Sequence, residues 1–273
     1  MPVVDGQQEK PRYLLDECAN RWRTTEKLVI ERGLMMLRYH NPLFESFKEL
    51  KMKYTHTKKD AIYAITSAAK EYKKRLDGRN YLFIYRDRKN DEIGFFETLF
   101  LPRNYQHLTG VEFVDAEGNV QKNAVFFYRK CLAGKLKENE IRFKSDGTTP
   151  LKLEALPKLI EFLRFSKMTA IYNGMRPRLA VDRVAGTINY CLGFTKERDY
   201  YVPSSCLLED VRKLGDNPAQ ILAIMSKEVT VKRKIYTEIN YVAKGVPFNK
   251  LLLPQELRNL ISLENYVENK TKR

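Results

Sequence analysis

The pattern of apolar residues changes at about residue 80, and this change constrains the fold more than any other feature of the sequence. Before that point, apolar side chains recur mostly at helical spacing. After Asn80 the chain consists largely of short runs rich in aromatic and β-branched residues, separated by polar turn clusters. Helices followed by many short strands are typical of an α+β protein.

We therefore expect a helical N-terminal region over residues 1–78 and an α+β domain over residues 79–273. In the first region, Thr57 to Asp60 has the pattern of a helix N-cap, and that helix should end near Asp77-Gly78. The expected strands are 81–85, 93–101, 169–172, 178–184, 187–194, 200–203, 220–227 and 229–242. Further helices are expected at 123–136, 151–165, 206–214 and 254–265.

The chain carries a large positive charge: 49 Lys and Arg against 34 Asp and Glu leave a net charge of +15. Such a field attracts polyanions. The excess is spread over both ends of the chain and forms no basic tail, so we expect a basic face on a folded domain and nucleic acid as the partner. Solubility and chance are the alternative explanation of the charge.

Several other classes of function are disfavoured. No apolar run is long enough to span a bilayer and the N-terminus has no signal-peptide pattern, so we expect a cytoplasmic protein without a membrane partner. The four cysteines lack zinc-site spacing, and buried free thiols are expected. Phosphate-binding glycine loops, the HExxH helix and the GxSxG elbow are absent, and no persuasive carboxylate cluster is visible for a metal-dependent nuclease.

Of the three histidines, His107 is the strongest candidate for chemistry. His40 lies at a helix end and His56 in a lysine-rich loop, where capping and solvation explain them better. His107 follows a predicted strand in an expected loop that is rich in hydrogen-bond donors, Pro102 to Val111. A neutral imidazole there could take a proton from a ribose 2′-hydroxyl while Thr109 and nearby cations hold the phosphate. The alternative is a hydrogen-bonded structural histidine.

The segment Asn104 to Val111 resembles the HLTGV signature of a phage and mobile-element family classed with the Barnase-EndoU-colicin-RelE-like nucleases. The resemblance covers roughly residues 80 to 245. It extends, in order along the chain, to Phe126–Leu136, Leu192–Phe194, Tyr201–Ser205, Glu209–Arg212 and Ile221–Lys227.

The resemblance implies helices packed on a small, mainly antiparallel sheet whose concave face binds RNA. It also implies metal-independent cleavage in which the 2′-oxygen attacks the adjacent phosphorus, so no cofactor or metal is expected. The implied catalytic residues are His107, Thr109 and Lys227, with Lys227 stabilising the phosphorane. The substrate-binding candidates are Arg103, Tyr105, Arg129, Tyr201 and Ser205.

Structural alternatives exist for three of these residues. Lys227 can be a turn lysine beside Glu228, Tyr201 a half-buried sheet residue, and Ser205 a cap for the helix expected at Cys206. The leading hypothesis is an endoribonuclease-like protein, with an antitoxin or host protein as a further partner. The second hypothesis is a non-catalytic mobile-element protein that binds nucleic acid or inhibits a host defence factor.

Overall fold

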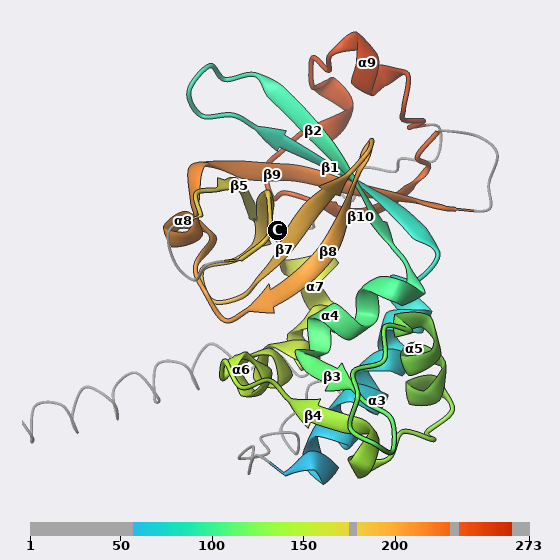
Figure 1. The fold of residues 1–273 in the computed structure, drawn as a ribbon. Coiled ribbons are helices and arrows are strands. Elements are labelled where there is room, and N and C mark those ends of the chain that lie inside the picture. Colours follow the sequence, from blue (N-terminus) through green and yellow to red (C-terminus); the bar gives the residue numbers. More distant parts are fainter. Residues whose placement is uncertain (1–56, 175–178, 230–234, 264–273) are drawn as a thin grey trace, which may run out of the picture. The chain divides into compact units, whose positions relative to one another are not determined.

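The computed structural model describes residues 57–174, 179–229 and 235–263 (Figure 1). The chain divides into two units, and all the described residues belong to the second, Tyr54–Arg273. The expected N-terminal helices before residue 57, with His40 and His56, lie outside the described residues. The domain boundary between residues 78 and 79 therefore stays a prediction.

Seven strands of this unit close into a mixed β-barrel. The order of neighbours is β1-β2-β8-β7-β6-β5-β9, and β9 pairs back with β1, while β10 adds to β9 outside the ring. All pairs are antiparallel except β2 and β8, which run parallel and are in register at Thr98 and Tyr201. The strands are β1 Arg79–Arg86, β2 Ile93–Phe100, β5 Met168–Tyr172, β6 Arg183–Gly186, β7 Cys191–Glu197, β8 Tyr200–Leu207, β9 Gly215–Glu228 and β10 Glu238–Val242.

The expectation of a small, mainly antiparallel sheet is therefore wrong. The sheet closes because β9, with 14 residues, is long enough to pair with β5 along its first part and with β1 along its second. Both faces of β1 are buried, since five consecutive residues from Asn80 to Ile84 are inaccessible to solvent. A strand buried on both faces has a continuous apolar run, which does not show which strands will be its neighbours.

Strand β9 also starts earlier than the sequence predicts. The expected strand began at Gln220, whereas the observed strand begins at Gly215 and includes Gly215-Asp216-Asn217-Pro218. In the structure Asn217 has a φ of 49°, and the pairing with β5 is irregular opposite this segment, between Thr169 and Ile171. A proline and a left-handed residue are tolerated in a strand at such a bulge, and bulges allow a strand to bend around a barrel.

Helices gather at one end of the barrel, around a separate two-stranded sheet (Figure 1). Helix α3 begins as predicted, because the backbone N–H of Asp60 donates to the side-chain oxygen of Thr57 at 3.2 Å. The helices and the two short strands are α3 Lys58–Arg75, η1 Pro102–Asn104, α4 Tyr105–Thr109, β3 Val111–Phe113, α5 Ala124–Leu132, η2 Glu138–Glu140, β4 Ile141–Phe143, α6 Thr148–Ala155, η3 Leu156–Glu161, α7 Phe162–Phe165, α8 Val211–Leu214, η4 Phe248–Lys250 and α9 Gln255–Arg258.

Several expected elements differ in extent. The helix expected over 151–165 is divided into α6, η3 and α7, and Pro157 at its first junction lacks the backbone N–H that a continuous helix needs. The segment 206–214 is mostly not helical, because β8 continues to Leu207 and only α8 is a helix. The segment around His107, expected as a loop, contains η1 and α4.

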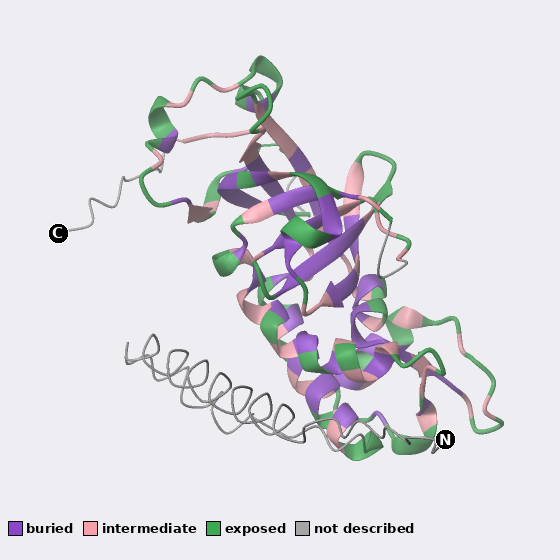
Figure 2. Cartoon of the chain, turned by 90° about the vertical axis from the view of Figure 1, so that its left-hand side faces the viewer, coloured by how far each residue is buried: buried purple, intermediate pink, exposed green. Residues whose placement is uncertain are grey.

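The main hydrophobic core fills the barrel and continues into the helical layer (Figure 2). Inside the barrel, Phe83 stacks on Phe96 with ring centroids 4.8 Å apart, and Phe194 packs near both. Helix α3 contributes Tyr72 to the same core, and the Tyr72 hydroxyl donates to the carbonyl of Leu101 at 2.9 Å. Two smaller clusters lie on the outside of the barrel, one beneath α9 and one beneath α8.

In the part of the chain that the structure describes, no helix combines the length and apolar character needed to cross a membrane.

Gly110 ends α4 in a way that matters for the residues around His107. It has a φ of +72°, which is the usual helix-terminating conformation of glycine. A Cβ atom at this position would lie 2.9 Å from Cδ of Lys152 and 3.2 Å from Cα of Thr149. Helix α6 can therefore approach the end of α4 closely because residue 110 has no side chain.

We expect Phe194→Ala to lower the free energy of unfolding by about 3–5 kcal/mol, because it removes a fully buried ring from the barrel interior. Ile188→Ala is the control, since Ile188 is 59% exposed and its loss should change stability by less than about 0.5 kcal/mol. Urea denaturation followed by circular dichroism measures both. Equal losses of stability from the two substitutions would contradict the burial of Phe194 inside the barrel.

We expect Gly110→Ala to destabilise the protein more than Gly118→Ala. Both glycines have a positive φ, so both substitutions carry the left-handed penalty of about 1–2 kcal/mol. Only at Gly110 would the new methyl group also contact neighbouring atoms, because no atom lies within 4 Å of a Cβ at Gly118. The unfolding free energies of the two variants are measured by urea denaturation, and their difference reports the close approach of α6 to α4. Equal unfolding free energies would argue against this close approach.

Candidate functional site

His107 lies on the solvent-exposed side of the short helix α4. The opposite side of this helix is anchored by Tyr105 and Leu108, which are fully buried. The turn before it is held by Asn104, whose side-chain oxygen accepts a hydrogen bond from the backbone N–H of Leu101 at 3.1 Å. The sequence thus fixes a rigid, one-turn support that leaves the imidazole open to solvent.

Two lysines lie beside His107, from segments that follow it by about forty residues. The Nζ atom of Lys152 on α6 donates to the carbonyl oxygen of His107 at 2.8 Å. Thr149 ties the surrounding segments together, because its hydroxyl donates to the carbonyl of Gly110 at 2.5 Å and accepts from the backbone N–H of Lys144 at 2.9 Å. The ends of β4, α6 and α4 therefore meet next to His107.

This environment favours the neutral form of His107. Although the residue as a whole is exposed, partial desolvation of the ring lowers the pKa of His107, and the positive charges of Lys152 and Lys144 lower it further. Glu197 acts in the opposite direction and raises this pKa. Burial is also the main cause that lowers the pKa of Lys152, and the nearby Lys144 adds to it.

Arg103 pairs with Glu197, the acidic residue that acts on the pKa of His107. It lies in η1, one turn before α4, and its guanidinium donates to the carboxylate of Glu197 at 2.6 Å. Both side chains of this pair are about half exposed, so the pair adds little to stability. The ion pair joins η1 to the end of β7, next to the turn that leads into β8.

Two predicted site residues in this segment are buried. The Thr109 hydroxyl donates to the carbonyl of Gln106 at 2.7 Å, and the residue is fully buried. The Tyr105 hydroxyl donates to the carbonyl of Ile65 at 2.5 Å, and burial raises the pKa of Tyr105 well above its usual value. Neither hydroxyl has a surface exposed to a substrate, and both hold α4 in place.

The remaining substrate-binding candidates are separated from one another. Arg129 is exposed on α5, among helices that pack around α3. Ser205 is buried on β8, and its hydroxyl has no hydrogen-bond partner among the described residues. Ser205 does not cap a helix, because β8 continues beyond it to Leu207.

Lys227 is not brought to His107. It lies near the end of β9, and strands β1 and β2 stand between β9 and β8, the strand on which α4 packs. Its ammonium group lies 4.3 Å from the centroid of Tyr236, whose hydroxyl donates to Glu97 at 2.5 Å. Tyr236 belongs to the cluster beneath α9, so Lys227 faces away from the barrel interior.

Tyr201 is half-buried and lies near the start of β8. Cys206, whose thiol donates to the carbonyl of Leu108 on α4, lies near the other end of this strand. The Tyr201 ring packs against Phe96 with centroids 5.6 Å apart, and the guanidinium of Arg183 lies 5.7 Å from its centroid.

The sequence analysis did not identify Arg183 and Lys152 as site residues. Arg183 stands at an inward position of a mostly apolar strand, which was a usable signal, whereas nothing near Lys152 in the sequence indicates a partner 45 residues earlier.

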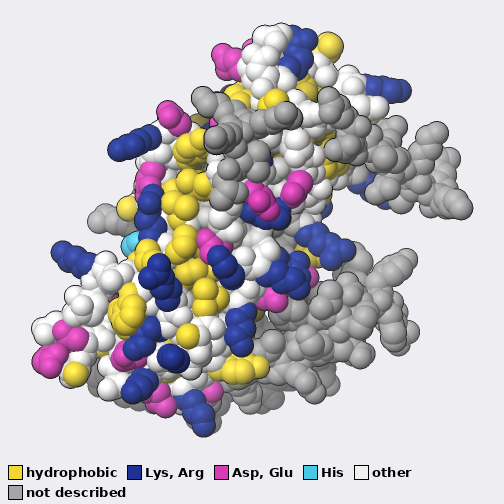
Figure 3. Space-filling view, turned by 90° about the vertical axis from the view of Figure 1, so that its right-hand side faces the viewer, with side chains coloured by type: hydrophobic (Ala, Val, Ile, Leu, Met, Phe, Trp, Pro, Cys, Tyr) yellow, Lys and Arg dark blue, Asp and Glu magenta, His cyan; other side chains and the backbone are white. Residues whose placement is uncertain are grey.

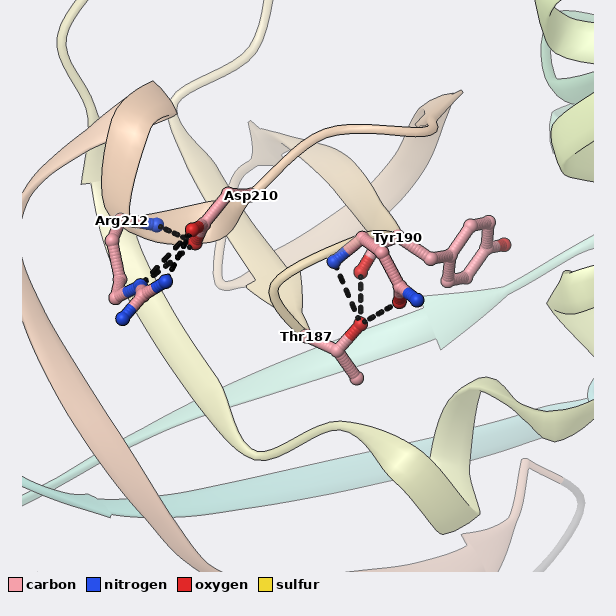
Figure 4. Close-up of polar contacts among 5 residues, drawn as sticks. Thr187, Tyr190, Asp210 and Arg212 are labelled. Atoms are coloured by element: carbon pink, nitrogen blue, oxygen red, sulfur yellow. Dashed lines mark hydrogen bonds and ion pairs between the residues drawn. The ribbon is translucent and has the colours of Figure 1, made fainter. Parts of the chain in front are cut away.

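The segment Glu209–Arg212, which carried part of the family resemblance, has a structural role (Figure 4). Asp210 caps α8, because its carboxylate accepts from the backbone N–H of Arg212 at 2.9 Å. The same carboxylate accepts from the Arg212 guanidinium at 2.6 Å, and both contacts lower the pKa of Asp210. Thr187 makes a comparable local turn with Asn189 and Tyr190.

The positive charge does not form one patch on the face shown in Figure 3. On the face shown in Figure 3, Lys and Arg side chains are interspersed with hydrophobic and acidic ones and do not form a single continuous patch. Within residues 57–174, 179–229 and 235–263, no group of three or more His, Cys, Asp or Glu side chains is placed to hold a metal ion.

Comparison with known proteins gives one match. The family model described as phage-Barnase-EndoU-ColicinE5/D-RelE like nuclease4 matches residues 64–245, which is most of the unit described above and includes His107, Lys152 and Arg183. No curated protein and no solved structure gives a significant match. Because the family model spans more than half of the chain, the protein belongs to this phage family of Barnase-EndoU-ColicinE5/D-RelE-like nucleases.

Proposed function

We propose that the protein is an endoribonuclease and that His107 is its general base. The observation that carries this proposal is an exposed imidazole held next to two lysines, with its pKa lowered so that the neutral, proton-accepting form predominates near neutral pH. Membership of a nuclease family supports nucleic acid as the substrate. The choice of RNA rests on the chemistry available to an imidazole, because only RNA has a 2′-hydroxyl that can attack its own phosphodiester.

In this mechanism His107 removes the proton from the 2′-hydroxyl, and the 2′-oxygen attacks the adjacent phosphorus. The bond from phosphorus to the 5′-oxygen breaks, that oxygen takes a proton from water, and the products are a 2′,3′-cyclic phosphate and a 5′-hydroxyl. The negative charge that builds on the phosphoryl oxygens is stabilised by Lys152 and Lys144. Thr109 and Tyr105 act as positioning residues, because their hydroxyls hold α4 and do not reach the surface.

We assign the phosphate-stabilising role to Lys152 and not to Lys227. Lys152 already contacts the backbone of His107, whereas Lys227 lies over Tyr236 on the outside of the barrel. The pKa of Lys152 is lowered mainly by burial, so its ammonium group is partly desolvated. A partly desolvated cation interacts more strongly with a developing anion than a fully hydrated one does.

We expect His107→Ala to lower cleavage of total RNA in excess chelator by at least about a hundredfold, the usual contribution of a general base. Gln106→Ala is the matched control, since Gln106 is the neighbouring residue on α4 and its backbone carbonyl, which the substitution keeps, accepts the hydrogen bond from Thr109. The product ends are identified by mass spectrometry, where a cyclic phosphate is expected. If the wild-type protein and His107→Ala cut RNA equally well, the proposed function is wrong.

The pH dependence of kcat/KM provides a second test, because His107 must be neutral to act as a base. Lys152 lowers the pKa of His107, so Lys152→Met should raise it and move the acidic limb of the profile to higher pH. Glu197 raises this pKa, so Glu197→Gln should move the same limb to lower pH. Shifts in the same direction, or none, would show that the limb does not report His107.

A further inference from the structure

The side chain of Arg183 crosses the interior of the barrel. Strand β6, which carries it, pairs only with β5 and β7. Its guanidinium nevertheless lies 4.7 Å from the ring centroid of Phe96 on β2, 5.2 Å from that of Tyr85 on β1 and 5.7 Å from that of Tyr201 on β8. Strands β1 and β2 lie across the ring from β6, and β8 is separated from β6 by β7, so the side chain must extend into the lumen.

Arg183 has no acidic partner within ion-pair distance among the described residues. Its Nε atom is buried without a hydrogen-bond partner, and Nη1 makes one long contact, 3.4 Å, to the hydroxyl of Thr169. The three aromatic rings compensate part of the desolvation of this cation. A guanidinium that lacks both an anion and a partner for Nε is well suited to bind an anion from outside.

Residues at this end of the lumen are partly exposed to solvent. Ile171, directly opposite Arg183 on β5, is 53% exposed, and Lys196, directly opposite Tyr201, is also exposed. Tyr85 and Tyr201 are only half-buried, so part of each ring remains accessible. We call this region the lumen opening; it consists of Tyr85, Ile171, Arg183, Lys196 and Tyr201.

The strand opposite Tyr85 keeps that ring in position. Gly94 pairs directly with Tyr85, and a Cβ atom at Gly94 would lie 2.6 Å from the Tyr85 ring. The ring therefore lies across the backbone of β2 at the edge of the lumen. An aromatic ring held over backbone, next to a guanidinium, offers a rigid surface on which a planar group can stack.

We propose that the lumen opening binds an unpaired nucleotide of a single-stranded nucleic acid. A base stacks against Tyr85 or Tyr201, and the adjacent phosphate pairs with Arg183 and Lys196. Single-strand binding commonly combines aromatic stacking with cations that follow the backbone. This inference deepens the proposed function, on which it rests, because Glu197, the residue after Lys196, also forms the ion pair with Arg103 beside His107.

The base of a duplex cannot stack on a protein ring without leaving its partner, so the lumen opening should select single strands. We therefore expect tighter binding of a single strand than of the duplex of the same sequence. The probe is a fluorescently labelled single-stranded DNA, which lacks the 2′-hydroxyl and cannot be cut by the proposed reaction. Fluorescence anisotropy measures its affinity for the full chain.

Arg183→Gln and Tyr201→Leu should each weaken binding of this probe about tenfold or more, within the range for loss of a stacked base or its phosphate contact. Arg75→Gln is the matched control, because it removes a cation that is exposed on α3 and paired with Glu71, and it should change the affinity less than about twofold. If Arg183→Gln does not fold, Tyr201→Leu decides. Unchanged affinity in the folded variants, or equal binding of single strand and duplex, would overturn the inference.

A direct contact is tested by placing 5-iodouracil in the probe and irradiating the complex. Cross-links should map to Tyr85 or Tyr201, and cross-links confined to other residues would exclude the lumen opening as the stacking site. RNA cleavage by His107→Ala is measured in parallel. Unchanged RNA cleavage by His107→Ala would refute the proposed function. Unchanged DNA affinity of the Arg183 and Tyr201 variants would refute only the inference about the lumen opening.

Discussion

The pairing of β9 with β1 closes the sheet into a barrel, and most other features of the domain depend on this closure. It places Tyr85 within reach of Arg183 on the opposite wall and encloses the rings of Phe83, Phe96 and Phe194. An open sheet of the same strands would expose one face of β1 to solvent. Closure instead buries both faces, which explains why β1 is apolar along most of its length.

The barrel also provides the support on which the helical layer positions its functional groups. Helix α4 is fixed to β8 through Cys206, whose thiol donates to the carbonyl of Leu108 at 3.1 Å. Helix α6 approaches α4 closely only because Gly110 lacks a side chain, and this approach brings Lys152 to His107. The buried hydroxyls of Thr109 and Thr149 donate to the carbonyls of Gln106 and Gly110 and stabilise this contact. Thr109 and Tyr105, which the sequence suggests as site residues, thus direct their hydroxyls to backbone carbonyls.

The sequence predicted local features well. The N-cap of α3 at Thr57 is confirmed. The strands expected at 81–85 and 93–101 are present as β1 and β2, which pair with each other in an antiparallel arrangement. The sequence-based prediction failed at two places: the strand expected from Gln220 begins at Gly215 as β9, and the segment around His107, expected as a loop, contains η1 and α4. For the site, His107 could be selected because few histidines occur. Lys152 could not, because its contact joins residues far apart in the chain.

The sequence by itself determined the periodicity that separates helices from strands, the helix cap at Thr57, the net charge of +15 and the donor-rich segment around His107. These properties depend on residues that are neighbours along the chain. Only the tertiary structure decided that the sheet closes, that Lys152 and not Lys227 contacts the backbone of His107, and that Arg183 extends into the lumen. The physical reason is that strand pairing and side-chain contacts over such separations are selected by the packing of the whole core, of which any single segment contains only a part.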